Sequence, residues 1–304
     1  MPLKYAKDMP EARSKLLRYL TTSAADDWAM SARRIALPVP PEVSPEPKAD
    51  LPERLAIYTH DLISTAELFW AHEAFSHLAA ESGKTLPAFR CHPDMLPART
   101  GLLVWADPVA SRITSIGRQA ARGFAWKADE DGVWVIGYDD SPVFSRPELA
   151  AVTIGMGWLA ESTSFYLPWR DELLVTAPTN AVATEKFSET WLRCAVSTWL
   201  LMEQRALADV QSGEALRPAD RRRFERRGHP TTPARIVSIA GGHGNGGGGE
   251  SDREYQSRWV VSGHWRNQPW GPKGAYRRPT WIAPYIKGPE DAPILHSERV
   301  HTIR

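Results

Sequence analysis

The chain has 304 residues, of which 42% are apolar and 13 are tryptophan, so it can bury a sizeable core and wholesale disorder is excluded. No stretch approaches the roughly 18 apolar residues of a membrane span, and the first residues do not form a secretion signal. The two cysteines, Cys91 and Cys194, are too few and too far apart for a disulfide framework or a zinc ribbon. We therefore expect a cytoplasmic protein that does not enter a membrane.

The net charge of +1 conceals an uneven distribution along the chain. From Gly213 to Arg304 there are 16 lysines and arginines against 9 acidic residues, a balance of +7. The first 212 residues hold the remaining 21 basic residues against 27 acidic ones, a balance of −6. This division indicates an anionic partner for the C-terminal part alone.

Residues 1–50 form the first of three expected parts. They contain one short helical segment, Glu11–Leu20, followed by the proline-rich stretch ALPVPPEVSPEPKADLP, which is typical of an extended arm. We interpret the arm as a spacer, and a ligand for the aromatic groove of a partner is the alternative.

Residues 51–215 form the second part, for which we predict an α+β domain. Apolar residues recur every three or four positions over Pro52–Glu81, which predicts one long helix that stops at Gly83. The segments GLLVWA, RGFAWK and GVWVIGY, all within Thr100–Tyr138, are rich in valine and aromatic residues and predict strands of one sheet. A wide apolar stripe predicts a second core helix over Thr184–Val210.

Residues 216–304 form the third part, which opens with a short basic helix. Pro218 suits its first position and Gly228 suits the position after its end. Phe224 is its main apolar anchor, and cationic side chains cover most of the remaining surface: Arg221, Arg222, Arg223, Arg226 and Arg227. Such a helix favours contact with a polyanion.

The rest of the third part predicts a small, tryptophan-rich antiparallel β module. Strands are expected at Ala234–Ala240, Tyr255–Gln268, Arg278–Lys287 and Arg299–Ile303, with a glycine-rich loop after the first of them. The expected fold class is therefore α+β, with a mixed helix and sheet part that has long core helices and a small C-terminal antiparallel β module.

Alternation along Arg258–Gln268 separates two faces of a strand. One face, with Trp259 and Trp265, is expected in the core. The other face and the next strand give the expected nucleic-acid surface: Arg258, His264, Arg266, Gln268, Arg277, Arg278, Trp281 and Lys287. Cationic groups bind phosphates and exposed aromatic rings stack on bases. The alternative is a protein interface, in which arginine and tryptophan stack against the acidic part of the chain.

The usual metal and nucleophile motifs are absent or poorly formed. His72 and His77 are five residues apart, which places their rings about 140° apart around a helix, so we predict no metal site. Cys91 beside His92 is interpreted as a structural thiol. Metal-independent cleavage of RNA would use His264 as acid or base, with Arg258 and Arg266 stabilising the phosphate. Lys287 or His301 would complete the set, and no cofactor is expected.

Several segments resemble a family of proteins carried by actinobacterial mobile elements and phages. The matching segments, which cover about two thirds of the chain, include LMEQRALAD, ADRRRFERRG, RWVVSGHWRNQPWG, RRPTWIAPYIKGPEDAPIL, TGLLVWADP and GVWVIGY. The resemblance implies a toxin, defence or replication-accessory role. RWVVSGHWR, with its Arg-x-x-x-x-Gly-x-x-Arg pattern, is also similar to the small sheet of RelE-like ribonuclease toxins, although the loop Pro269–Arg278 is longer than theirs.

The sequence therefore favours a nucleic-acid-binding protein, with RNA preferred over DNA and a metal-independent ribonuclease as its enzymatic form. A non-catalytic accessory or regulator of replication or transfer is the second hypothesis. A module that binds a protein partner, such as an antitoxin, is the third. Strong salt dependence without turnover would favour the second hypothesis, and insensitivity to RNA and DNA would favour the third.

Overall fold

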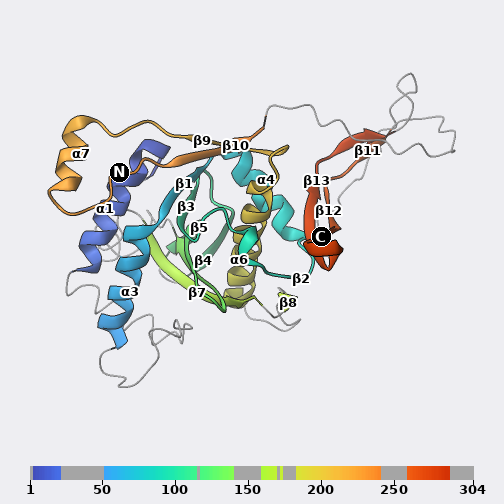
Figure 1. Ribbon diagram of the computed structural model, residues 1–304, viewed down its shortest axis with the longest axis horizontal. Helices are drawn as coiled ribbons and strands as arrows, with labels where there is room; N and C mark the ends of the chain where they lie inside the picture. Colours follow the sequence, from blue (N-terminus) through green and yellow to red (C-terminus); the bar gives the residue numbers. More distant parts are fainter. Residues whose placement is uncertain are drawn as a thin grey trace.

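The computed structural model describes residues 3–21, 51–114, 117–139, 159–169, 172–173, 183–240 and 259–287. Its centre is an eight-stranded mixed sheet (Figure 1). From one edge to the other the strands are β7 (Ala160–Pro168), β6 (Gly132–Asp139), β5 (Gly117–Ala128), β3 (Thr100–Trp105), β1 (Glu67–Ala71), β10 (Arg235–Ile239) and β9 (Ala208–Ser212), and β4 (Ala110–Thr114) pairs with β5. Strand β1 runs parallel to β3 and β10, and the other neighbours are antiparallel.

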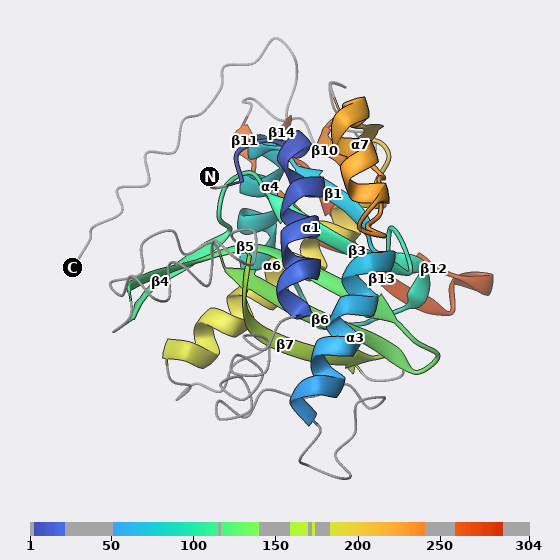
Figure 2. The same cartoon turned by 90° about the vertical axis from the view of Figure 1, so that its left-hand side faces the viewer.

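Two layers of helices cover the sheet. Helices α1 (Met9–Leu20) and α3 (Leu51–Thr65) lie on one face, and α4 (Glu73–Lys84) and α6 (Ala183–Met202) lie on the other (Figures 1 and 2). Each layer encloses its own cluster of buried apolar side chains. None of the helices in the described ranges has the length and apolar character needed to cross a bilayer.

Smaller elements complete the fold. Strand β2 (Phe89–Arg90) pairs with β8 (Glu172–Leu173), β11 (Trp259–Val261) with β14 (Tyr285–Lys287), and β12 (His264–Trp270) with β13 (Tyr276–Ile282). The short helices are η1 (Ala6–Asp8), η4 (Pro93–Met95), α7 (Pro218–Glu225) and η5 (Pro272–Gly274). The predicted α+β class and its small C-terminal antiparallel module are confirmed. Residues 36–50 of the proline-rich arm, the glycine-rich loop, Arg258 and the strand expected at Arg299–Ile303 lie outside the described residues.

The long helix predicted over Pro52–Glu81 is wrong, because strand β1 divides it into α3 and α4. Leu68 and Trp70 point into the cluster beside α1 and α3, whereas Phe69 and Ala71 point into the cluster beside α4 and α6. A strand buried on both faces is apolar at every position, and its pattern cannot be distinguished from that of a buried helix.

Two further elements differ from the prediction, one in its end and one in its pairing. The second core helix ends at Met202 rather than Val210, and the chain then forms β9. The strand expected at Ala234–Ala240 exists as β10, but it pairs with β1 and β9 in the large sheet instead of joining the C-terminal module. The division into three parts at residues 50 and 215 stays a prediction.

A buried arginine connects the N-terminal helix to distant segments. Arg13 of α1 is 1% exposed and donates hydrogen bonds to the carbonyl oxygens of Ala66 (3.2 Å), Pro230 (3.1 Å) and Thr232 (3.2 Å). Burial lowers the pKa of Arg13 to about 10, which leaves it charged at neutral pH. One guanidinium therefore joins α1, the turn before β1 and the segment after α7.

Replacing Arg13 tests this connection. Arg13→Met should lower the free energy of unfolding by about 3 kcal/mol, because three carbonyl groups lose a charged donor. Arg18→Met, at an exposed position of the same helix, is the matched control and should change it by less than about 0.5 kcal/mol. Urea denaturation measures both values. Equal effects of the two substitutions would contradict a special role for Arg13.

His229 makes a second contact with the same helix. Its Nδ1 lies 2.8 Å from Ser14 Oγ. Burial, together with the positive charges of Arg227 and other neighbours, lowers the pKa of His229 below its ordinary value of 6.5. The unfolded chain therefore takes up a proton on His229 at a higher pH than the folded protein does, and acidification through this range favours unfolding.

We expect this linkage to be visible in a pH series of thermal denaturations. Between pH 7.5 and pH 5 the wild-type protein should lose more stability than His229→Gln, whose side chain does not titrate. A variant that loses as much stability as the wild type would show that other groups account for the acid sensitivity.

Candidate nucleic-acid interface

Strands β12 and β13 form a hairpin at the end of the molecule opposite α7 (Figure 1). Its ladder runs from His264 opposite Ile282 to Trp270 opposite Tyr276. The turn at its tip contains left-handed residues, and a Cβ atom at Gly271 (φ 77°) would lie 2.4 Å from the ring of Tyr276. Glycine is therefore required there, and it fixes the shape of the tip.

Two tryptophans attach the inner face of this hairpin to the core. Trp265 Nε1 donates a hydrogen bond to the carbonyl oxygen of Ser82 in α4 at 2.8 Å. Trp281 packs edge-to-face against Trp265, with ring centroids 5.2 Å apart. A Cβ atom at Gly263 would lie 2.4 Å from the Trp281 ring, so the ring occupies the space that a side chain would need there. The hairpin is thus held in one orientation.

This packing corrects the role expected for Trp281. We predicted that its ring would stack on bases, which requires an exposed face. The side chain is only 8% exposed and belongs to the apolar cluster beside α4 and α6. Trp281 therefore orients the hairpin rather than contacting a ligand.

The outer face of the hairpin brings four of the predicted residues together. His264, Arg266 and Gln268 alternate along β12, and Arg278 lies opposite Gln268 on β13. His264 and Arg266 are exposed, and His264 Nδ1 lies 3.1 Å from the carbonyl oxygen of Ser262 just before its strand. The guanidinium of Arg278 lies over the Trp270 ring, 5.4 Å from its centroid.

Lys287 lies apart from this group. It is opposite Trp259 in the two-stranded sheet β11–β14, five residues beyond Ile282. Five strand positions correspond to on the order of 16 Å. The ladder therefore places His264 and Arg266 side by side but does not bring Lys287 beside them.

The segment from His264 to Lys287 contains no acidic residue. Its cationic residues are Arg266, Lys273, Arg277 and Arg278 in the hairpin and Lys287 beyond it. Glu203, which follows α6, is an acidic neighbour of Arg278: burial raises the pKa of this carboxyl group, and the charge of Arg278 opposes the rise. The charged residues of the segment are therefore all basic. Glu203, which lies outside the segment, partly balances the charge of Arg278.

A cavity of about 410 Å³ lies between the tip of the hairpin and the segment that contains β2 and η4, and residues from both faces of the hairpin line it. Its residues come from the hairpin and from the segment that contains β2 and η4: Phe89, Arg90, His92, Met95, Asn267, Trp270, Tyr276 and Arg277. Asn267 alternates with Trp265 on the strand face that was expected in the core, but it is exposed and lines this cavity instead. Phe89, Arg90 and His92 were not predicted, because nothing in the sequence places them beside the hairpin.

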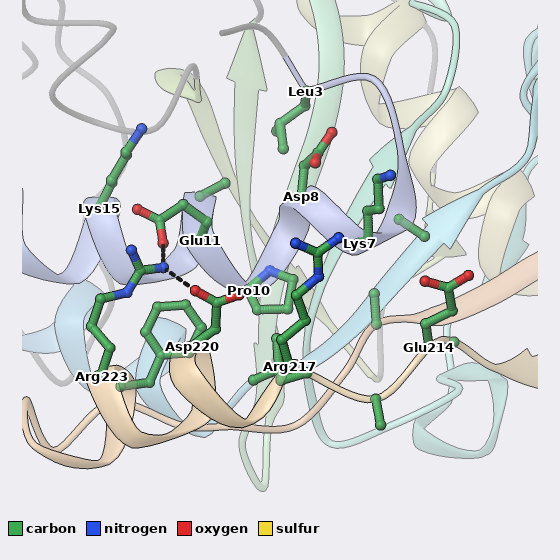
Figure 3. Close-up of a pocket in the computed structure, with 17 residues that line it drawn as sticks. Leu3, Lys7, Asp8, Pro10, Glu11, Lys15, Glu214, Arg217, Asp220 and Arg223 are labelled. Atoms are coloured by element: carbon green, nitrogen blue, oxygen red, sulfur yellow. Dashed lines mark hydrogen bonds and ion pairs between the residues drawn. The ribbon is translucent and has the colours of Figure 1, made fainter.

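The basic helix α7 packs on the other side of the molecule. Phe224 is its buried anchor, as predicted, with 1% exposure. Arg223 forms ion pairs with Glu11 of α1 and with Asp220 (Figure 3), which makes it a structural contact. The other four, Arg221, Arg222, Arg226 and Arg227, are exposed, and Arg221 lies 3.7 Å from Glu225. The predicted nucleic-acid-binding residues of α7 and those of the hairpin therefore lie at opposite ends of the molecule (Figure 1).

A second cavity, of about 510 Å³, lies between α1 and α7 (Figure 3). Both signs of charge line it, including the basic residues Lys7, Lys15 and Arg217 and the acidic residues Asp8 and Glu214. Mixed charge of this kind does not select a polyanion.

Other reactive side chains have structural explanations. Glu73, His77 and Asp107 place one ligand-type atom each within 4.8 Å of one another. The sequence did not reveal this grouping because Asp107 lies outside α4, the helix that holds Glu73 and His77. His77 Nε2 and Asp107 Oδ2 are 2.9 Å apart, so an exposed hydrogen bond accounts for this cluster. Burial raises the pKa of both the Cys91 and Cys194 thiols to about 12, which leaves them unreactive at neutral pH.

No protein-family model matches the chain, and no curated protein matches it in sequence. Among solved structures, the crystal structure of AcrVA2 is similar, with a TM-score of 0.41 and 11% sequence identity. The similarity covers 78% of this chain and 76% of AcrVA2. A likeness of this degree bears on neither the site nor the function.

Loss of the Trp265 anchor should loosen the hairpin and leave the sheet intact. Trp265→Ala should raise the hydrogen-exchange rate of the β12 and β13 amides by about tenfold or more, because the local opening free energy falls. Trp265→Phe, which removes the hydrogen bond to Ser82 and keeps an aromatic ring, should have a smaller effect. Amides of β6 serve as the internal control. Unchanged exchange in β12 would show that the anchor lies elsewhere.

Proposed function

We propose that this chain binds single-stranded nucleic acid, RNA in preference to DNA, on the outer face and tip of the β12–β13 hairpin. The observation that carries the proposal is a well-anchored hairpin with four cationic residues and no acidic one. An ordinary solvent-facing strand pair carries both acidic and basic residues. A surface without carboxylates suits a phosphate backbone, because each carboxylate would repel the phosphates.

The aromatic residues at the tip favour a single strand over a duplex. Trp270 and Tyr276 lie opposite each other, with ring centroids 6.0 Å apart, and Tyr276 is 42% exposed. Base stacking on such rings needs bases that are already unpaired. Sequence-reading RNA modules use the same combination of a small sheet, exposed aromatic rings and flanking arginines, which is why RNA is placed before DNA.

Cleavage stays a separate prediction. A metal-independent ribonuclease needs an acid and a base within reach of one phosphodiester. His264 and Arg266 share the outer face, but Lys287 does not lie beside them. We therefore propose binding without turnover.

The exposed arginines of α7 are the second candidate surface for nucleic acid. Binding of a protein partner, such as an antitoxin, stays the alternative from a different functional class.

The salt dependence of binding tests the proposal. Arg266→Ala combined with Lys273→Ala should weaken binding of a labelled 20-nucleotide RNA and reduce the log–log salt slope by about 0.7 for each phosphate that the variant no longer neutralises. Fluorescence anisotropy at several salt concentrations gives the slope. Both residues are exposed, so the fold should be unaffected.

Arg222→Ala combined with Arg226→Ala on α7 is the matched control, since it removes the same charge at the opposite end. A slope reduced by the α7 pair and not by the hairpin pair would move the interface to α7. Absence of binding to RNA and DNA at low salt would contradict the proposal and favour a protein partner.

A further inference from the structure

The cavity beside the hairpin is suited to one nucleotide, an inference that rests on the nucleic-acid binding proposed above. Its volume of about 410 Å³ falls within the range of roughly 300–1,000 Å³ that small-molecule sites occupy. Trp270 and Tyr276 belong both to the hairpin tip and to the cavity. A strand lying on the tip can therefore place one of its nucleotides in the cavity.

Three rings form an ordered aromatic wall in this cavity. His92 lies edge-on to Trp270 with ring centroids 4.9 Å apart, and it is 5.9 Å from the Tyr276 ring. Trp270 and Tyr276 are 6.0 Å apart. Phe89 and Met95 are buried and add apolar surface. Because each ring contacts the other two, the wall is in place before a ligand binds, and a flat heterocycle is the ligand that such a wall accepts.

The polar groups of the cavity match an adenine and its phosphates. Asn267 lines the cavity, and its carboxamide makes no hydrogen bond within the described part of the chain. An asparagine carboxamide pairs with the N6 and N7 atoms of adenine through two hydrogen bonds. Arg90 and Arg277 also line the cavity and are exposed, while none of the described lining residues is acidic.

We propose that the cavity binds the base of one unpaired adenine in the bound strand. The base stacks on the wall of Trp270, Tyr276 and His92, and its edge pairs with Asn267. Arg90 and Arg277 contact the flanking phosphates. The hairpin thus supplies affinity through charge, and the cavity supplies base preference through Asn267.

Anisotropy measurements with fluorescein-labelled ten-nucleotide oligo(rA) and oligo(rU) test this assignment. The wild-type protein should bind oligo(rA) about tenfold more tightly. Asn267→Ala should remove that preference by weakening oligo(rA) binding alone, whereas Trp270→Leu should weaken both about tenfold. Gln211→Ala, which deletes an exposed side-chain amide from β9 in the large sheet, is the control and should leave the ratio unchanged.

AMP used as a competitor distinguishes a nucleotide in a strand from a free one. It should displace oligo(rA) only at concentrations roughly a hundredfold or more above the oligonucleotide Kd, because it lacks the contacts along the hairpin. Displacement at equal concentrations would overturn the assignment in favour of a free nucleotide. Equal binding of the two oligonucleotides, or a preference that survives Asn267→Ala, overturns the adenine assignment and leaves the salt-dependent binding standing. Failure of both oligonucleotides to bind removes the proposed function itself.

Discussion

The burial of strand β1 on both faces is the constraint on which the rest of this structure depends. Its side chains alternate between two apolar layers, so helices must cover both faces of the sheet. Neighbouring strands must also form hydrogen bonds with the backbone N–H and C=O groups along both edges of β1. Strands β3 and β10 supply the edges. The chain leaves β1 directly into α4, and Ser82 near the end of α4 accepts the hydrogen bond from Trp265. The position of the charged hairpin thus follows from the position of the central strand.

The hairpin is attached to the core through one face, and its other face carries the proposed binding surface. Trp265 and Trp281 hold the inner face against the core, which gives the cationic residues of the outer face a fixed direction. A flexible basic tail would attract the same polyanions but would lose conformational freedom on binding. At the tip, a cavity lies between the hairpin and the segment that includes Ala88, Phe89 and Arg90.

The sequence predicted the elements that have a local residue pattern, but it did not predict residues whose role depends on contacts with distant parts of the chain. Strands β3, β5 and β6, helix α1 and the start of α7 at Pro218 follow from valine-rich runs, apolar spacing and proline placement. Residues 68–71 were misassigned because burial from two sides removes the alternation that identifies a strand. Arg223 resembled its neighbours until the fold placed Glu11 next to it. The outward direction of His264 and Arg266 was predictable, whereas His92 could join the site only through tertiary contacts.

The parallel pairing of β1 with β10 has a consequence for the order in which the molecule can form during synthesis. Phe69 is aligned with Arg235, so one edge of the central strand has no partner until most of the chain has left the ribosome. An unpaired edge in the middle of an apolar layer is a template for strands of other nascent chains. Pairing across so long a separation is also slow, because a large loop must close first. From this topology we expect incomplete chains to self-associate and to need chaperones, independently of what the finished protein binds.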